Sequence, residues 1–372
     1  MNIGITKELN NNEKRVAATP SSVEKLTKLG FNVLIEKGLG DSIFASDSLY
    51  EKAGAKIMDN SKAILSSCDI ILRLDKPSEE EISSLKEQSI YISFLNPFKE
   101  KNLIKLLAKK NISAISMELI PRITRAQKMD ALSSQASLAG YVAVIIATRE
   151  SQKVLPMQIT PAGTISPARV FIVGAGVAGL QAIATAKRLG ARVEAFDTRP
   201  EVAEQIQSLG AKFIKIDIGE TEKTKDGYAK QLTDEQIKKQ RDQMTKICSI
   251  SDIIVTTAQV FGRTAPLIIT DEMISQMKPG SVILDMAVES GGNVSGSEIN
   301  KIKIINNVKI VGLAKLPSFV APDASEMYAN NLYNLIKEFW NKETKMFDLN
   351  LDDQIIKSCL VTYNGSIVNE ML

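Results

Sequence analysis

A glycine-rich turn between an apolar strand and a helix constrains the fold of this chain more than any other stretch. The apolar run 170–173 is followed by Gly174-Ala175-Gly176-Val177-Ala178-Gly179 and then by the helix-forming segment 181–189. This order of strand, G-x-G-x-x-G turn and helix is typical of a dinucleotide-binding unit. We therefore expect a parallel α/β domain that binds a dinucleotide.

Each glycine of the turn has a separate expected role. Gly174 lets the chain turn off the strand, Gly176 lets the backbone approach a pyrophosphate, and Gly179 lets the helix pack close to the strand. The helix N-terminus adds unpaired N–H groups and a partial positive charge. We predict that all six residues from 174 to 179 contact the nucleotide, and the alternative is a glycine-rich turn that binds nothing.

An acidic residue follows the next expected strand. That strand, 192–196, ends at Asp197, which lies 18 residues after Gly179. A carboxylate there accepts hydrogen bonds from both ribose hydroxyls of NAD and repels the 2′-phosphate of NADP. Arg199 would soften this repulsion. The cofactor is therefore predicted to be NAD(H), with Asp197, Thr198 and Arg199 among its contacts.

Length and composition limit the class of protein. A chain of 372 residues predicts two domains, and its 44% apolar content supports full cores. The net charge is only +3, and residues of both signs are interspersed along the chain, so we expect no nucleic-acid partner. The three cysteines have no metal-binding spacing and indicate a reducing compartment. No signal peptide is recognised, and no window of 18 apolar residues predicts a membrane span.

Histidine is absent from the sequence. The commonest general acid/base and the commonest zinc ligand are therefore missing, and we predict no metal site. Any chemistry must use Asp, Glu, Lys, Tyr or Cys, or must need no proton transfer.

Two series of strands alternate with helices along the chain. The first comprises 2–5, 32–35, 69–74, 89–94 and 113–117, and the second comprises 170–173, 192–197, 212–216, 252–256, 281–285 and 308–312. The predicted fold class is α/β with two domains, each a mostly parallel doubly wound sheet, and the second a Rossmann NAD-binding fold. Ala258 and Gln259 follow the fourth strand of the second series, so we expect them near the nucleotide.

The expected domains follow from these series. The first covers 1–135 and is completed by a returning helix at 325–342, the second covers 136–324, and the tail 343–372 is unassigned. An apolar helix at 131–150 bridges them, and 156–167 is a connecting segment. The polar insertion 218–243 is either a surface loop or a mobile lid, and Tyr228 is its lone aromatic residue.

A second dense patch lies at 121–141 and contains Arg122, Gln127, Asp130 and Ser133. Its residues alone indicate a polar turn that caps a helix, either as packing with surface charge or as part of a site. Together with 174–191, the patch resembles the NAD(H)-binding component of proton-translocating nicotinamide nucleotide transhydrogenase. The resemblance extends to about residue 340 and includes 15–20, 227–230, 256–258, 262–263, 265–266 and 291–293.

The resemblance implies roles for these residues. Arg122, Gln127 and Asp130 would orient the dihydronicotinamide, Ser133 would be a further contact, and Tyr228 would lie on a mobile loop that closes on nucleotide. The implied activity is Re/Si-specific hydride transfer from NADH to NADP⁺ on a partner component, coupled to proton movement. Two departures from the family pattern are Val260-Phe261 and Phe319.

The resemblance also implies an assembly. The component would form a homodimer and would act only with an NADP(H)-binding beta subunit and a membrane-spanning subunit. This chain would be the split-subunit form, cytoplasmic and peripheral on the inner face of a bacterial plasma membrane.

Hydride transfer between two nicotinamides explains how a chain without histidine can be an enzyme. Only C–H bonds at C4 form and break, so the protein has to hold the two rings within ~3–3.5 Å, aligned and dry. The first rival is alanine dehydrogenase, because Arg15 matches the arginine that binds the substrate carboxylate in that family. That family also uses a histidine and a lysine for proton transfer. This chain has no histidine, and the segment 72–77, where the lysine would lie, does not match the family pattern. The second rival is a non-catalytic NAD sensor.

Overall fold

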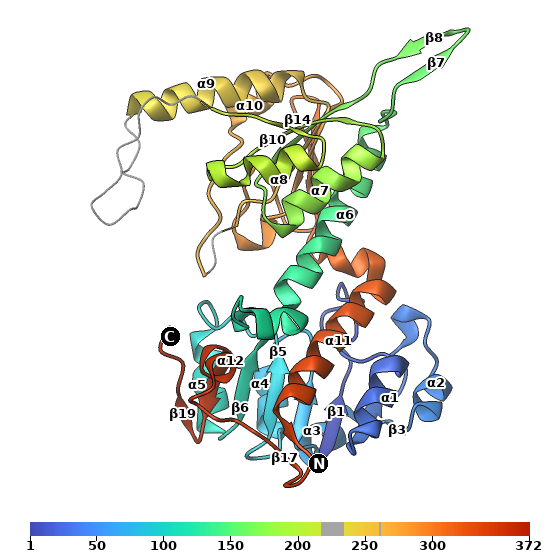
Figure 1. Ribbon diagram of the computed structural model, residues 1–372, viewed down its shortest axis with the longest axis vertical. Helices are drawn as coiled ribbons and strands as arrows, with labels where there is room; N and C mark the ends of the chain where they lie inside the picture. The colour runs from blue at the N-terminus through green and yellow to red at the C-terminus, as the bar shows by residue number, and fades with distance from the viewer. Residues whose placement is uncertain (217–233, 260–261) are drawn as a thin grey trace. The chain divides into compact units, whose positions relative to one another are not determined.

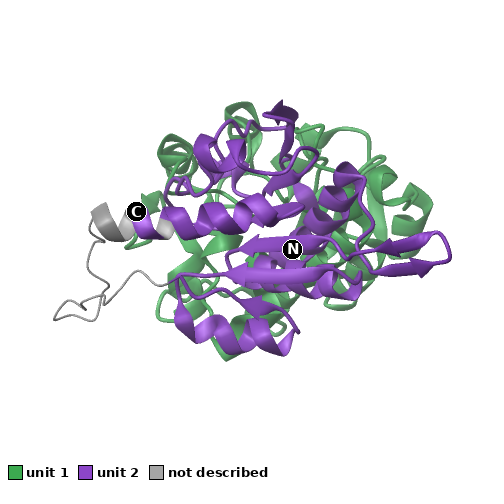
Figure 2. Ribbon diagram, turned by 90° about the horizontal axis from the view of Figure 1, so that it is seen from above, with its two compact units in different colours: residues 1–135, 317–372 green, residues 136–316 purple. Residues whose placement is uncertain are grey.

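The structure is a computed structural model that describes residues 1–216, 234–259 and 262–372 (Figure 1). The chain divides into two units, which are coloured separately in Figure 2. Unit 1 contains 1–135 and 317–372, and unit 2 contains 136–316. Residues 317–324, expected in the second domain, therefore belong to unit 1, and so does the tail that the sequence left unassigned.

Unit 1 is built on an eight-stranded sheet with the order β19-β18-β6-β5-β4-β1-β2-β3. The strands from β6 to β3 in this order are all parallel. Their bounds are β1 (Asn2–Ile5), β2 (Asn32–Glu36), β3 (Ala55–Met58), β4 (Ile70–Leu72), β5 (Ile90–Ser93) and β6 (Ser113–Ser116). Strands β4, β5 and β6 are buried throughout, as expected for parallel strands covered on both faces.

Helices cover this sheet, and their ends follow local signals. Thr19 and Ser22 form a capping box at the start of α1 (Pro20–Lys28). The remaining helices between strands are α2 (Asp47–Lys52), α3 (Ser61–Ser67), α4 (Glu79–Ser84) and α5 (Lys101–Lys109). The sequence analysis missed α2, β3 and α3. Strand β3 has no fully buried residue, so its apolar pattern is weak.

The C-terminal segment completes unit 1. It contains α11 (Ala321–Phe339), the two-stranded pair β16 (Trp340–Asn341) and β17 (Met346–Phe347), α12 (Gln354–Cys359), β18 (Leu360–Tyr363) and β19 (Ser366–Ile367). Strand β18 pairs antiparallel with β6, and the Thr362 hydroxyl donates to the Ile112 carbonyl at 2.7 Å. The tail therefore adds β18 and β19 to one edge of the sheet.

Unit 2 has a seven-stranded sheet with the order β11-β10-β9-β12-β13-β15-β14. All its strands except β14 run parallel. Their bounds are β9 (Arg169–Val173), β10 (Arg192–Phe196), β11 (Lys212–Phe213), β12 (Ile253–Thr256), β13 (Val282–Asp285), β14 (Lys301–Ile305) and β15 (Val308–Gly312). Without β14, which the sequence missed, the order is that of a doubly wound dinucleotide-binding sheet, and the predicted fold class is confirmed.

The helices of unit 2 are α7 (Val177–Arg188), α8 (Ala203–Ser208), α9 (Asp234–Ile250) and α10 (Asp271–Ser275), together with most of α6 (Ala131–Ser151). A Cβ atom on Gly140 would lie 2.1 Å from the carbonyl oxygen of Ala178. Glycine at this position therefore lets α6 pass close to the first turn of α7.

Helix α6 differs from the expectation that no stretch of the chain is apolar enough to span a membrane. Among the described residues it is the one helix long and apolar enough to cross a membrane by length and composition. In the relevant window 44% of the residues are buried. Core helices pass the same test, so this is weak evidence for a span.

The connecting segment after α6 forms a hairpin that the sequence did not predict. Strands β7 (Gln158–Thr160) and β8 (Gly163–Ile165) pair antiparallel, and all six residues are exposed. Figure 1 shows the hairpin projecting away from the body of unit 2.

Candidate dinucleotide-binding site

The glycine-rich turn of unit 2 has the geometry that its sequence predicts. Strand β9 ends at Val173, Gly174 has a φ of +99°, and Gly176 is the N-cap of α7 with an extended backbone. A Cβ atom on Gly174 would lie 2.5 Å from the Thr257 hydroxyl oxygen, and one on Gly179 would lie 1.9 Å from the Gly174 carbonyl oxygen. At both positions any side chain would clash with neighbouring protein atoms, so the fold itself requires glycine.

Gly176 differs from its two neighbours. Its φ is −76°, which any residue adopts, and among the described residues a Cβ atom there would have no heavy atom within 4 Å apart from those of its chain neighbours and the helix backbone. The described fold therefore does not require glycine at this position. Gly176 is the N-cap of α7, so an added Cβ would lie at the end of a helix where phosphate binds. These residues fit the pyrophosphate of a dinucleotide.

Asp197 follows β10 and is held against the turn. Its Oδ2 accepts the Ala175 N–H at 2.8 Å, and its Oδ1 accepts the Arg199 N–H at 2.9 Å. The Arg199 guanidinium donates to both oxygens at 3.0 Å. Burial raises the pKa of this carboxyl group, but the hydrogen bonds from Arg199 and the two backbone groups outweigh burial and keep the pKa below its ordinary value. Asp197 is therefore ionised at neutral pH.

The segment after β12 is fixed by a buried asparagine. Asn293 is fully buried, its Oδ1 accepts the Ala258 N–H at 3.1 Å, and its amide nitrogen donates to the carbonyls of Ala258 and Pro266 at 2.9 and 2.8 Å. The fully buried Asp285 accepts the Asn293 N–H at 3.0 Å. Gln259 donates to the Met286 carbonyl at 3.0 Å. Sequence reasoning noted Asn293 in a matching stretch but assigned it no role.

The loop predicted to orient nicotinamide lies in unit 1. It contains a 3-10 helix, Thr124–Met129, and Asp130 then caps α6. The Asp130 carboxylate accepts the Ser133 N–H at 2.9 Å and the Ser133 hydroxyl at 2.6 Å. Arg122 and Gln127 are exposed, and within the described residues their side chains make no hydrogen bond. The structure thus joins Asp130 to Ser133 and leaves Arg122 and Gln127 exposed.

Side chains from the C-terminal segment support this loop. Arg125 pairs with Asp353, and Lys128 pairs with Glu338 at 2.7 Å. The Asn331 amide donates to the Lys128 carbonyl at 3.0 Å. Sequence reasoning missed these three partners, because no local pattern connects residues more than 200 positions apart.

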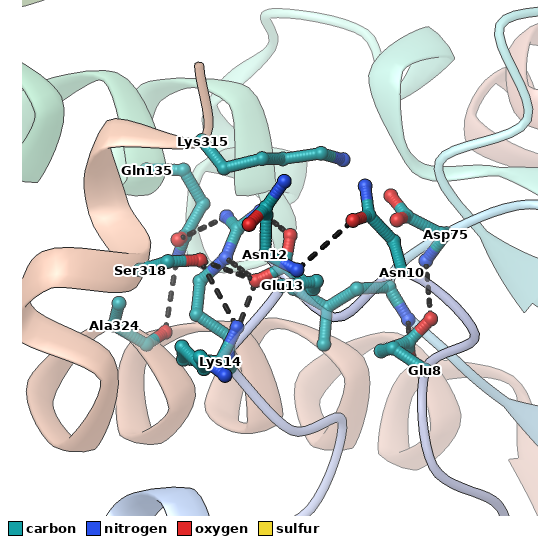
Figure 3. A network of polar contacts seen from close by, with 12 residues as sticks. Glu8, Asn10, Asn12, Glu13, Lys14, Asp75, Gln135, Lys315, Ser318 and Ala324 are labelled. Carbon is teal, nitrogen blue, oxygen red and sulfur yellow. Dashed lines mark hydrogen bonds and ion pairs between the residues drawn. The ribbon is translucent and has the colours of Figure 1, made fainter. Parts of the chain in front are cut away.

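A buried ion pair in unit 1 holds Arg15. The guanidinium donates to both carboxylate oxygens of Glu13 at 2.7 and 2.6 Å and to the Gln135 side chain at 2.8 Å. The Ser318 hydroxyl also donates to Glu13, and Gln135 donates to the Ala324 carbonyl. Figure 3 shows Glu13, Gln135 and Ser318 directed toward one another.

The remaining sequence predictions concern Tyr228, the polar insertion and the two departures from the family pattern. Tyr228 and the departure at 260–261 lie outside the described residues. The described end of the polar insertion begins helix α9 at Asp234. The second departure, Phe319, is exposed on unit 1.

A Rossmann unit with this turn and this acid, in one chain with a second doubly wound unit, defines a two-domain dinucleotide-binding protein. Family models match both domains, "Alanine dehydrogenase/PNT, N-terminal domain" at 4–139 and "Alanine dehydrogenase/PNT, C-terminal domain" at 143–370. The chain therefore belongs to the alanine dehydrogenase/PNT family.

Relatives place the chain on the transhydrogenase side of this family. It is 44% identical over 379 aligned positions to the first portion of the NAD(P) transhydrogenase alpha subunit of Rhodospirillum rubrum, covering 100% of this chain and 99% of that one. It is 26% identical to an alanine dehydrogenase of Methanococcus maripaludis, covering 100% and 95%. A solved transhydrogenase structure from Sinorhizobium meliloti superposes with a TM-score of 0.89, at 42% identity, covering 99% and 100%. The resemblance expected from the sequence is confirmed.

Proposed function

We propose that this chain is the NAD(H)-binding component of a proton-translocating NAD(P) transhydrogenase. The observation that carries the proposal is the 44% identity to the Rhodospirillum rubrum transhydrogenase alpha-subunit chain over nearly its whole length. In this proposal NADH binds to this chain, NADP⁺ binds to a partner beta subunit, and a further subunit carries protons across the membrane. The chain is then peripheral on the cytoplasmic face of a bacterial plasma membrane.

The chemistry fits the side chains that are present. The bound nicotinamides supply hydride donor and acceptor, so the protein needs to bind, orient and exclude water. The turn 174–179 and Asp197 bind the pyrophosphate and the adenosine ribose. Asp130, fixed by Ser133, and Arg122 hold the nicotinamide amide, and Gln127 extends toward the acceptor nucleotide. The side chain of Gln127 has no internal hydrogen bond among the described residues to give up.

The rival reading as an alanine-type dehydrogenase has less support. An oxo-acid site needs an arginine free to pair with substrate carboxylate, and Arg15 is buried and already bidentate on Glu13. It also needs a proton donor, and the chain has no histidine. A non-catalytic sensor would not require the exposed Arg122 and Gln127 of the loop.

Rapid mixing of the NADH-loaded chain with NADP⁺ on a purified NADP-binding partner tests the proposal. Hydride transfer that requires the partner supports it. Tight NADH binding with no transfer would contradict it, and turnover of pyruvate and ammonia would then favour the dehydrogenase.

Shortening Gln127 to asparagine is expected to lower the hydride-transfer rate roughly 100-fold, because an error of about 1 Å in placement costs that much. The NADH dissociation constant should change less than threefold, since Gln127 is assigned to the acceptor side. Single-turnover rates and fluorescence titration of NADH measure the two quantities. Gln276→Asn, at an exposed glutamine after α10, is the matched control. Equal losses in rate and affinity would show that the assignment of Gln127 is wrong.

The homodimer of this proposal would use the hairpin β7–β8. An isolated two-stranded hairpin is marginally stable in water. This one exposes Ile159 (71%) and Ile165 (45%), and Met157 (59%), directly before β7, is exposed as well. Apolar side chains and strand edges are therefore both available to a second copy.

Replacing Ile159 with aspartate is therefore expected to weaken the dimer at least tenfold, because a charge would have to be desolvated at the contact. Light scattering over a range of protein concentrations measures the mass. Ile304→Asp is the control, since Ile304 on β14 is similarly exposed at 68%. A hairpin variant that stays dimeric at the same concentrations as the unchanged chain would exclude this interface.

A further inference from the structure

Asp197 has no unused acceptor position in this structure. Its Oδ1 accepts the backbone N–H and the Nε of Arg199, and its Oδ2 accepts the Ala175 N–H and the Nη2 of Arg199. A carboxylate offers about four lone-pair positions, two on each oxygen. All four are therefore taken by donors of the chain itself.

Ribose hydroxyls can hydrogen-bond to Asp197 only if one of these donors leaves. The Ala175 N–H belongs to the glycine-rich turn and the Arg199 N–H belongs to the main chain beside the acid, so both are held by the backbone. The Arg199 side chain is 53% exposed, whereas the Asp197 side chain is 7% exposed. The guanidinium is thus the donor that can move at least cost, because it is the exposed partner and solvent can hydrate it when it leaves the carboxylate.

We propose that Arg199 competes with the adenosine ribose for Asp197 and thereby sets how strongly the site prefers NAD(H) to NADP(H). The inference rests on the proposed NAD(H) binding and adds a residue that tunes its specificity. In this structure the guanidinium donates to both carboxylate oxygens. On binding of NAD(H) it moves away, and the two ribose hydroxyls donate to the oxygens that it leaves.

The displaced guanidinium has a second consequence for a nucleotide with a 2′-phosphate. Asp197 repels that phosphate, but Arg199, once it leaves the carboxylate, is two residues away and provides a bidentate partner for phosphate oxygens. Arg199 therefore weakens the binding of NAD(H) and offsets part of the repulsion of NADP(H). Both effects reduce the discrimination that Asp197 alone would supply.

Arg199→Ala is expected to tighten NADH binding roughly two- to fivefold, because the competing donor is gone and an ion pair with one exposed partner contributes about 1 kcal/mol or less. It should weaken NADPH binding about tenfold through loss of the phosphate partner. The ratio of the two dissociation constants then rises at least tenfold. Arg199→Lys keeps the charge but not the planar guanidinium, so its ratio of dissociation constants is expected to lie between those of the unchanged chain and of Arg199→Ala. Arg192→Ala is the matched control, because Arg192 is an exposed arginine at the opposite end of β10.

Calorimetric titration of the isolated full chain with NADH and NADPH measures these constants without any partner. A parallel titration with AMP and with adenosine 2′,5′-bisphosphate should show the same ratio change, and reduced nicotinamide mononucleotide should show none. If Arg199 only stabilised the fold, its replacement would change the dissociation constants of all these ligands by a similar factor. Weaker NADH binding in Arg199→Ala, or an unchanged ratio, would overturn this inference. A chain that binds no NADH at all would instead contradict the proposed function.

Discussion

Replacing Gly176 with alanine is expected to lower NADH affinity about 100-fold or more and to leave the fold intact. A methyl group there would lie at the N-terminus of α7, where the backbone has to approach the pyrophosphate. Among the described residues no heavy atom outside the adjoining chain lies within 4 Å of that methyl position, and the φ of −76° suits alanine. Fluorescence titration gives the affinity. Chemical denaturation gives the free energy of unfolding, which should be unchanged or higher by about 0.4–1 kcal/mol.

Gly179→Ala provides the contrast. Its Cβ atom would lie 1.9 Å from the Gly174 carbonyl oxygen, so α7 would have to move away from the turn. This variant should lose both stability and affinity, whereas Gly176→Ala should lose affinity alone. If Gly176→Ala bound NADH as tightly as the unchanged chain, the phosphate could not lie over this turn.

Replacing Arg73 with methionine is expected to destabilise the chain by about 3–5 kcal/mol, the usual cost of removing one partner of a buried ion pair. The Arg73 side chain is fully buried, pairs with Glu8 at 3.1 Å and with Glu81 at 2.7 Å, and donates to the Thr6 hydroxyl. Methionine fills similar volume but leaves the buried Glu8 carboxylate without its cation. Urea denaturation measures the loss.

The loss should depend on pH. Burial raises the pKa of Glu8 above its ordinary value, and the positive charge of Arg73 offsets part of this shift. Without Arg73 the folded-state pKa rises further, so the folded state binds the Glu8 proton more tightly than the unfolded chain. The deficit relative to the unchanged chain is therefore smallest in acid, and it grows as pH rises from the folded-state pKa of Glu8 in the unchanged chain through the higher folded-state pKa in the variant.

A double variant separates charge from packing. Glu8→Gln combined with Arg73→Met removes the cation and the more deeply buried of its two carboxylate partners, and leaves the half-buried Glu81 charged. It should recover most of the stability and lose most of the pH dependence. A deficit of equal size at every pH, unchanged in the double variant, would mean that packing around Arg73 rather than the unpaired charge is responsible.

Much of the fold was predictable because its signals are local. The strand, glycine turn and helix of 170–189 lie within about twenty residues, and the φ of Gly174 follows from that short stretch. Most parallel strands are runs of apolar residues, so their positions could be located without knowing their neighbours. Strand β3 and the edge strand β14 were missed because their residues are only partly buried.

The candidate site was predictable as a list of residues and not as a set of contacts. Asp197 and Arg199 were both identified, but their bidentate pairing depends on the turn that β10 makes against β9. Asn293 reaches Ala258 across 35 residues, and Asp353 reaches Arg125 across 228. No periodicity in the sequence encodes such pairs, because they form only when separate elements pack together.

The sequence by itself determined that this chain contains a dinucleotide-binding unit, that any chemistry must proceed without histidine, and where the central parallel strands of both sheets lie. Backbone conformation and apolar runs are properties of short segments, so a single stretch is enough to specify them. Only the tertiary structure decided that Arg15 pairs with Glu13, that β18 pairs with β6 at the edge of the unit 1 sheet, and that Arg199 pairs with Asp197. Each of these contacts forms where elements pack together: Gln135 and Ser318 hold the Arg15 pair, β6 accepts β18, and the turn at Ala175 holds Asp197.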